Sequence, residues 1–160
     1  MGRRPTKAAD NPFCKARIKA AQYNDRLFSK EYASEQLGVS VSTLSDYELG
    51  LTKVVPPDMI IKMADLYKAP ELKNLYCREM CPLGCDLPKV EMDDLDRITV
   101  KALATFKNIE THKEKLLDIA ADGIISDNEK VDFENVIRAM DELTAVAFNL
   151  KAWAERNLEE

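Results

Sequence analysis

Apolar residues recur every three or four positions through most of the chain, and no stretch shows the alternation of apolar and polar residues that is typical of a β-strand. In the first half this pattern predicts five short helices. They cover residues 13–27, residues 30–37, a segment that Ser40 or Ser42 can cap and that runs to about Leu49, residues 59–67, and a segment from Pro70 to near Pro82. Ser29 is a good N-cap for the second helix, and Gly38 and Gly50 supply the left-handed backbone on which helices commonly end.

The second half predicts two long helices whose apolar positions follow a heptad-like seam, typical of a coiled coil. These positions are Leu95, Ile98, Ala102, Ile109, Leu116 and Ile119, then Phe133, Val136, Met140, Leu143, Ala147, Leu150 and Ala154. Gly123 suits the end of the first helix, and Ser126 with Glu129 forms a capping box for the second. A connection this short makes the helices antiparallel neighbours, so we expect an all-α chain that ends in a long antiparallel helical hairpin.

Charge changes along the chain as well. The net charge is −5, but there are 13 Lys and Arg against 10 Asp and Glu up to Cys85, and 10 against 18 after it. The segment from Cys81 to Pro88 is rich in Pro and Gly, a composition that favours a linker. We therefore expect a mobile basic arm at residues 1–12, a five-helix domain at 13–81, a linker at 82–92 and the hairpin at 93–160.

The segment from Ser29 to Gly50 reads SKEYASEQLGVSVSTLSDYELG and predicts two helices locked across a sharp turn. Ala33 and Ser34 are small where the two helices must cross. Three apolar residues hold the second helix on the first, and these are Val39, Leu44 and Tyr47. The remaining residues of the second helix face outward, and a helix held in this way can enter the DNA major groove.

This segment resembles the helix-turn-helix of the XRE family, the Cro and lambda-repressor-like regulators. The resemblance continues into Thr52, Lys53 and the helix after Pro57, so it covers roughly residues 13–76. It implies a five-helix lambda-repressor-like domain that binds double-stranded DNA. It also implies a structural role for Glu48.

The resemblance implies a role for each residue of the DNA-binding surface. The base-reading positions are Val41, Ser42, Thr43 and Asp46, and the phosphate-binding positions are Lys30, Ser40 and Lys53. The family often has Gln at the position of Lys30 and Arg near that of Asp46. Because the recognition helix here has no Lys or Arg, we expect extra phosphate contacts from Arg26 and from Arg3 and Arg4 in the arm.

The function that follows is a sequence-specific transcriptional regulator, a repressor of a phage or mobile element. The stretch from Tyr76 to Gly84 also resembles a tail seen in such regulators of low-GC Gram-positive bacteria. We expect a homodimer through the hairpin, because two antiparallel helices cannot bury both of their faces alone. The acidic surface of residues 91–160 leaves a second hypothesis open, a protein-interaction module or host-factor inhibitor that uses its helix-turn-helix for autoregulation.

Catalysis and membrane insertion are not expected. The chain has a single histidine, His112, in a charged stretch that predicts a solvent-facing position, and no catalytic arrangement is evident. No apolar run approaches the roughly 20 residues needed to cross a bilayer, and the basic start has no apolar segment behind it. We therefore expect a cytoplasmic protein that is not an enzyme.

Two metal sites are weaker alternatives, and no cofactor is expected. Four thiols could hold a structural zinc, and they belong to Cys14, Cys77, Cys81 and Cys85. Buried cysteines under the linker explain the same residues without metal. The stretch from Asp118 to Glu129 has the spacing of a calcium loop, but Ala120 removes a ligand, and a capped turn between two helices is the favoured interpretation.

Overall fold

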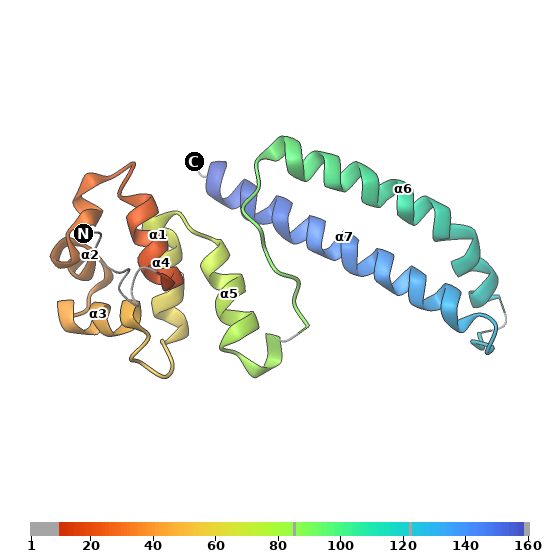
Figure 1. Cartoon of the computed structure of the whole chain (residues 1–160), viewed down its shortest axis with the longest axis horizontal. Helices are drawn as coiled ribbons and strands as arrows, with labels where there is room; N and C mark the ends of the chain where they lie inside the picture. Colours follow the sequence, from red (N-terminus) through yellow and green to blue (C-terminus); the bar gives the residue numbers. More distant parts are fainter. Residues whose placement is uncertain (1–9, 85, 122, 159–160) are drawn as a thin grey trace, which may run out of the picture. The chain divides into compact units, whose positions relative to one another are not determined.

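The computed structural model describes residues 10–84, 86–121 and 123–158, and every regular element within these ranges is a helix (Figure 1). The all-α prediction is therefore confirmed. The chain divides into two compact units, Met1–Leu87 and Pro88–Glu160, and this division falls inside the segment expected as a linker.

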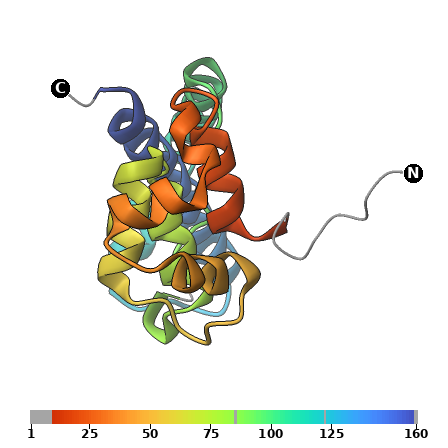
Figure 2. The same ribbon diagram turned by 90° about the vertical axis from the view of Figure 1, so that its left-hand side faces the viewer.

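The described residues of the first unit form five α-helices and the short 3₁₀ turns η2 and η3 (Figures 1 and 2). In chain order they are α1 (Pro12–Ala20), η2 (Asp25–Phe28), α2 (Lys30–Leu37), α3 (Val41–Leu49), α4 (Pro57–Tyr67), α5 (Glu71–Glu79) and η3 (Pro82–Gly84). They enclose one apolar core. Its most deeply buried large side chains are Phe13, Leu27, Leu37, Leu44, Ile60, Met63 and Leu72.

Capping residues set the limits of α2 and α3. The hydroxyl of Ser29 accepts a hydrogen bond from the backbone N–H of Tyr32 at 3.2 Å. The hydroxyl of Ser40 accepts one from the N–H of Thr43 at 3.0 Å, so Ser40 and not Ser42 caps α3. Gly38 and Gly50 follow the two helices with φ angles of 71° and 68°, in the left-handed region expected from the sequence.

The first helix is shorter than predicted. Residues 13–27 were expected to form one helix, but α1 ends at Ala20 and a separate turn, η2, follows at Asp25–Phe28. The Arg17 guanidinium explains this break, because its Nη1 donates to the backbone carbonyls of Leu27 at 2.8 Å and Phe28 at 3.2 Å. Those carbonyls would be out of its reach in a continuous helix, so the chain turns back and buries Leu27 in the core.

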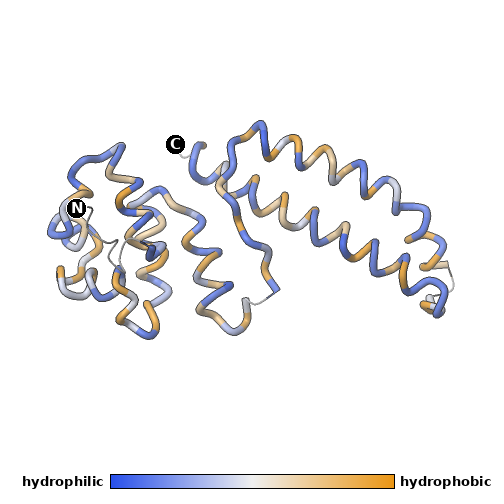
Figure 3. The backbone as a smooth tube through the Cα atoms, in the orientation of Figure 1, coloured by the Kyte–Doolittle hydropathy of each residue, from blue (hydrophilic) through white to orange (hydrophobic). Residues whose placement is uncertain are grey.

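The second unit is a hairpin of two long antiparallel helices, α6 (Leu95–Ala120) and α7 (Lys130–Asn157) (Figure 1). Contacts across the pair fix their register. The side-chain amide of Asn108 donates to the Glu142 carboxylate at 3.2 Å, and Lys115 pairs with Asp132 nearer the connection. Apolar residues recur along both helices, as the heptad-like pattern predicts (Figure 3).

The connection between the long helices partly follows the expected capping box. Gly123 has a φ angle of 71°, and the backbone N–H of Ser126 donates to the Glu129 carboxylate at 2.9 Å. The reciprocal side-chain contact is replaced by a backbone one, in which the N–H of Glu129 donates to the carbonyl of Ser126 at 3.0 Å. A single turn therefore precedes α7, which begins at Lys130.

The hairpin core is small, and it holds one residue that was expected elsewhere. His112 is half-buried rather than solvent-facing, because it lies on the side of α6 that meets Val136 and Met140 of α7. Its Nδ1 atom is buried and has no hydrogen-bond partner among the described residues. Much of the other apolar surface stays exposed, so the two helices alone do not cover their apolar residues.

Candidate nucleic-acid interface

The turn between α2 and α3 fixes which surface of α3 faces outward. Leu44 and Tyr47 are buried in the core, and Ala33 and Ser34 of α2 are buried as well. The small side chains of α2 allow the two helices to pack closely. Because the side of α3 that carries Leu44 and Tyr47 packs into the core, the opposite side of the helix is free to contact a ligand.

All four predicted base-reading residues lie on this outer side of α3. Val41 is 37% exposed and Ser42 is exposed, while Thr43 and Asp46 are half-buried. The hydroxyls of Ser42 and Thr43 differ in their availability to bond to a base. Thr43 shares its Oγ1 with the capping Ser40 at 2.8 Å, whereas Ser42 makes no side-chain hydrogen bond within the described part of the chain. Ser42 and Val41 are thus the most available side chains of the first turn.

A buried ion pair anchors the inner side of α3 to α1. The Nε atom of Arg17 lies 2.5 Å from Oε1 of Glu48, and its Nη2 lies 3.1 Å from Oε2. Both side chains are almost fully buried, at 3% and 0% exposed. Burial disfavours the charged guanidinium, but the hydrogen bond and the charge of Glu48 outweigh it and raise the pKa of Arg17. The pair is therefore charged and bidentate.

A second contact ties the start of α1 to the end of α3. Asn11 caps α1 through its side-chain oxygen, which accepts from the N–H of Phe13 at 2.9 Å. Its Nδ2 donates to the backbone carbonyl of Tyr47 at 3.1 Å. Asn11 and Arg17 together hold α3 in a fixed orientation. The sequence analysis gave no role to Arg17 and placed residues 11 and 12 in a mobile arm, but Asn11 caps α1 and Pro12 is its first residue.

Residues 22–72 match a family model described as a helix-turn-helix, HTH_3. Over this range the chain matches the Cro/C1-type helix-turn-helix of the XRE family. The matched range runs from the end of α1 to the start of α5 and includes α2, the turn and α3. No curated protein and no solved structure gives a match to the chain.

The match supports a DNA-binding regulator of the XRE type. The matched family is a DNA-binding regulatory domain and not a family of enzymes. The resemblance gave Glu48 a structural role, and in the structure its carboxylate is buried and paired with Arg17. No helix among the described residues is long and apolar enough to cross a membrane.

Lys30, expected at a phosphate, makes two contacts inside the domain. Its ammonium lies 3.2 Å from Oε2 of Glu48 and donates to the hydroxyl of Ser45 at 3.2 Å. The side chain keeps 32% of its surface exposed. A DNA phosphate at this position would therefore share the ammonium with Glu48, which weakens any contact that Lys30 makes with DNA.

The other phosphate candidates are placed differently. Lys53 is exposed in the loop after α3, and Arg26 is exposed with its guanidinium 5.8 Å from the centre of the Tyr32 ring. Ser40 is exposed at the cap of α3. Arg3 and Arg4 lie outside the described residues. Among the described phosphate candidates, Lys53 and Arg26 thus offer exposed positive charges.

The cysteines do not form a metal site in the described part of the chain. No group of three or more His, Cys, Asp or Glu side chains is placed there to hold a metal ion, and Cys85 lies outside the described residues. Cys14, Cys77 and Cys81 are free and half-buried. Burial and the nearby Glu48 carboxylate raise the pKa of the Cys14 thiol, which disfavours the thiolate that zinc requires.

Tyr67 lies beside the buried ion pair. Its hydroxyl is buried and has no hydrogen-bond partner among the described residues. Burial and the negative charge of Glu48 raise the pKa of Tyr67, so this phenol stays neutral. Tyr67 is therefore a neutral neighbour of the charged Arg17–Glu48 pair.

Proposed function

We propose that the protein is a sequence-specific DNA-binding repressor that inserts the first turn of α3 into the major groove. The observation that carries this proposal is the geometry of α3. Its Glu48 is bound to Arg17 of α1 on the buried side, and Val41 and Ser42 are exposed at its first turn. In helix-turn-helix proteins, the N-terminal residues of the recognition helix reach the base edges.

Each outward residue of α3 has a chemical partner on a base. The methyl groups of Val41 suit a thymine methyl, and the hydroxyl of Ser42 or Thr43 can bond to a base edge. The Asp46 carboxylate can accept from the N4 amino group of cytosine. We assign phosphate contacts to Lys53, Arg26, Ser40 and Lys30, with Arg3 and Arg4 adding charge from the N-terminal arm.

We infer repression because a protein bound over a promoter excludes the polymerase by its volume alone and needs no further contact. The setting that we propose is a phage or mobile element, on the resemblance of the sequence from Tyr76 to Gly84. Such a regulator acts in the cytoplasm of a bacterium.

We also propose that two copies associate through the hairpin. Leu103, Phe106 and Leu117 are more than half exposed on α6, at spacings of three and eleven residues that return to one side of a helix. On α7, Ile137 is 47% exposed. A second hairpin packed on these residues would complete a four-helix bundle, and a dimer places two recognition helices on paired half-sites.

A protein partner for the hairpin is a second candidate function. It is favoured by charge, because 18 acidic residues against 10 basic ones follow Cys85. Such a surface attracts a basic partner and repels DNA. In this case the helix-turn-helix would serve autoregulation, and the hairpin would carry the main activity.

A gel-shift titration tests the proposed function. The probe is the DNA upstream of the protein's own gene, compared with scrambled DNA of equal length at about 0.15 M salt, because affinity depends steeply on ionic strength. We expect tight binding to the native probe. The double variant Val41→Ala, Ser42→Ala should lose most of this preference, since each good base contact contributes about 1–3 kcal/mol of discrimination.

The matched control is the double variant Asn128→Ala, Val131→Ala, which removes similar side chains from exposed positions near the start of α7. It should bind the native probe like the unchanged protein. Equal weak binding to both probes by the unchanged protein would contradict specific recognition of this DNA. Copurification of a basic protein with the Val41→Ala, Ser42→Ala variant would then favour the second candidate function.

A further inference from the structure

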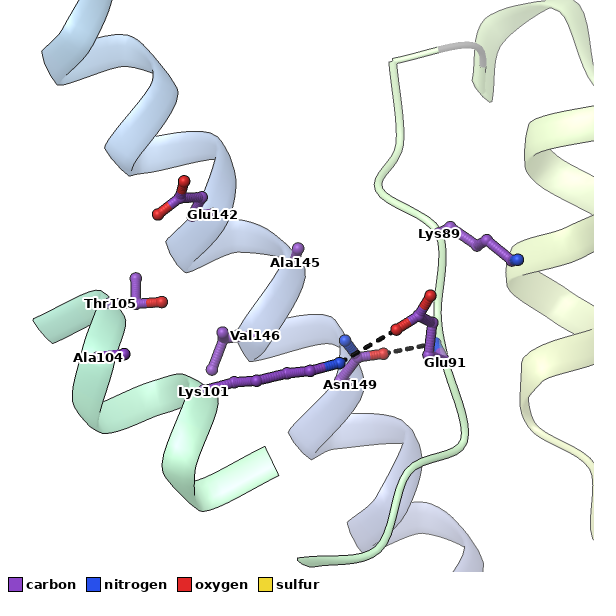
Figure 4. A pocket seen from close by; sticks show the side chains of 9 residues that line it. All are labelled: Lys89, Glu91, Lys101, Ala104, Thr105, Glu142, Ala145, Val146 and Asn149. Carbon is purple, nitrogen blue, oxygen red and sulfur yellow. Dashed lines mark hydrogen bonds and ion pairs between the residues drawn. The ribbon is translucent and has the colours of Figure 1, made fainter. Parts of the chain in front are cut away.

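A pocket of about 440 Å³ opens between the two helices of the hairpin (Figure 4). The extended segment that precedes α6 closes one side of it, with Lys89 and Glu91. The other walls are Lys101, Ala104 and Thr105 of α6 and Glu142, Ala145, Val146 and Asn149 of α7. Its volume lies within the range of about 300–1,000 Å³ that is usual for small-molecule sites.

Thr105 is unusual among the threonines of the hairpin helices. The hydroxyls of Thr99, Thr111 and Thr144 each donate to the backbone carbonyl four residues earlier, at 2.7, 3.0 and 2.9 Å. Thr105 makes no such bond, has no side-chain partner among the described residues, and is only 6% exposed. Its oxygen points across the pocket toward α7 (Figure 4). A hydroxyl that faces the pocket without a protein partner is free to bond to a group bound there.

Asn149 supplies a second buried polar group, at 7% exposed. Its Oδ1 accepts a 2.6 Å hydrogen bond from the backbone N–H of Glu91, which fixes the orientation of the amide. The Nδ2 group has no partner within the described part of the chain and faces the pocket (Figure 4). The pocket therefore holds a fixed donor as well as the hydroxyl of Thr105.

The charges of the lining are unevenly distributed. The Lys89 side chain points away from α6 and α7 (Figure 4), and the Lys101 ammonium is bound to Glu91 at 3.1 Å and to Asp93 at 2.6 Å. Lys101 and Asn149 form one corner of the pocket, which is rich in donors (Figure 4). Glu142 and Thr105 lie toward the opposite corner, and one oxygen of Glu142 accepts from Asn108 at 3.2 Å. Ala104, Ala145 and Val146 supply the apolar surface of the lining.

We propose that this pocket binds a small zwitterion of the amino-acid class. The carboxylate of the ligand accepts from Nδ2 of Asn149 and from the Lys101 ammonium, while its ammonium donates to Glu142 and to the hydroxyl of Thr105. The carbon segment between the two charged groups contacts the alanines and Val146. A ligand with one charge of each sign can use both the donor corner and the acceptor corner, whereas a singly charged one leaves one corner unused.

The site is independent of DNA binding and of the exposed apolar side of α6. Its α6 residues are Lys101, Ala104 and Thr105, whereas the exposed apolar residues on α6 include Leu103 and Phe106, on another side of the same helix. Ligand binding at this site can therefore be measured whether or not the protein binds DNA or forms a dimer.

Calorimetric titration of the full-length protein tests the proposal. The probes are glycine, 4-aminobutanoate and 6-aminohexanoate, a series in which the distance between the two charges increases. Butanoate and butylamine are the matched single-charge controls. We expect saturable binding of at least one zwitterion with a Kd near or below about 1 mM, and binding at least about tenfold weaker for the single-charge controls.

Two variants locate the site on the pocket. Thr105→Val keeps the shape of the side chain and removes an unpartnered hydroxyl, so thermal stability should be kept while affinity falls about tenfold, or about 1.4 kcal/mol. Glu142→Gln should also weaken binding. Glu134→Gln removes the same charge from an exposed position of α7 outside the pocket and should leave the affinity unchanged.

Three results would overturn the proposal. They are no binding of any zwitterion up to about 10 mM, equal binding of butanoate or butylamine, and unchanged affinity in Thr105→Val. None of these results depends on whether the protein binds DNA, so failure of the pocket and failure of the regulator function can be distinguished.

Discussion

At the scale of single residues, the Glu48 carboxylate links the recognition helix to α1. It receives two hydrogen bonds from Arg17 and lies 3.2 Å from the ammonium of Lys30. We predict that Glu48→Gln destabilises the protein by about 3–5 kcal/mol, because it leaves the buried Arg17 guanidinium without its counter-charge. Urea unfolding followed by circular dichroism measures this loss.

The control for this variant is Glu35→Gln, which removes a carboxylate from an exposed position on α2. Its effect should stay within about 0.5 kcal/mol, the usual range for surface substitutions. Equal stability of the two variants would show that the buried pair does not anchor α3. Weakened DNA binding by Glu48→Gln at a temperature where it remains folded would show that the pair also orients the helix.

Which of these residues the sequence could predict depends on how local their contacts are. Ser29 and Ser40 act on N–H groups three residues away, so short-range capping rules predict them. Arg17 and Glu48 are 31 residues apart, and nothing in the spacing of Arg17 distinguishes it from the exposed cations around it. The contacts of Lys30 with Glu48 and Ser45 were likewise out of reach, because they depend on how α2 and α3 pack.

At the scale of elements, the turn between α2 and α3 depends on the backbone of Gly38. Its φ of 71° is unfavourable for residues with a Cβ, although an added Cβ would have no heavy atom within 4 Å. We predict that Gly38→Ala lowers the free energy of unfolding by about 1–2 kcal/mol through backbone strain alone. Gly38→Asn should lose less, because asparagine tolerates this conformation. Thermal unfolding of both variants checks the order, and equal losses would point to a contact rather than to strain.

The elements themselves were predicted well where apolar spacing and caps agree, as in α2, α3 and the two long helices. They were predicted poorly where a side chain distant in the sequence binds backbone groups that the expected helix would use. The helix expected over residues 13–27 breaks because Arg17 captures the carbonyls of Leu27 and Phe28. The charged neighbours of His112 predicted a solvent-facing position. The residue lies in the hairpin instead, because position 112 is on the side of α6 that meets Val136 and Met140 of α7.

At the scale of the whole molecule, the two units differ in the completeness of their cores. Most apolar residues of the helices around α3 are buried in a single cluster. In the hairpin, five large apolar residues of α6 are at least 42% exposed, and these are Leu95, Val100, Leu103, Phe106 and Leu117. A soluble monomer rarely leaves a contiguous apolar surface of this kind uncovered, so the hairpin is the part of the molecule where self-association is expected.

The double variant Leu103→Glu, Phe106→Glu tests this expectation. It places two charges on the proposed dimer surface, so we predict that the solution mass falls from that of a dimer to that of a monomer, with helix content retained. Binding to paired half-sites should weaken by about 10²–10⁴, because the second half-site is then no longer held at a high effective concentration. Light scattering after gel filtration and a gel shift measure the two effects.

The matched control is Val131→Glu, which introduces one such charge at a 66% exposed position in the first turn of α7. That turn pairs with the end of α6 through Lys115 and Asp132, away from Leu103 and Phe106, so this variant should remain a dimer. A monomeric mass for the unchanged protein at micromolar concentration would contradict the dimer. A dimer that survives both glutamates would move the interface to another surface, because a like-charged cluster of four carboxylates cannot be buried at the centre of a four-helix bundle without counter-ions.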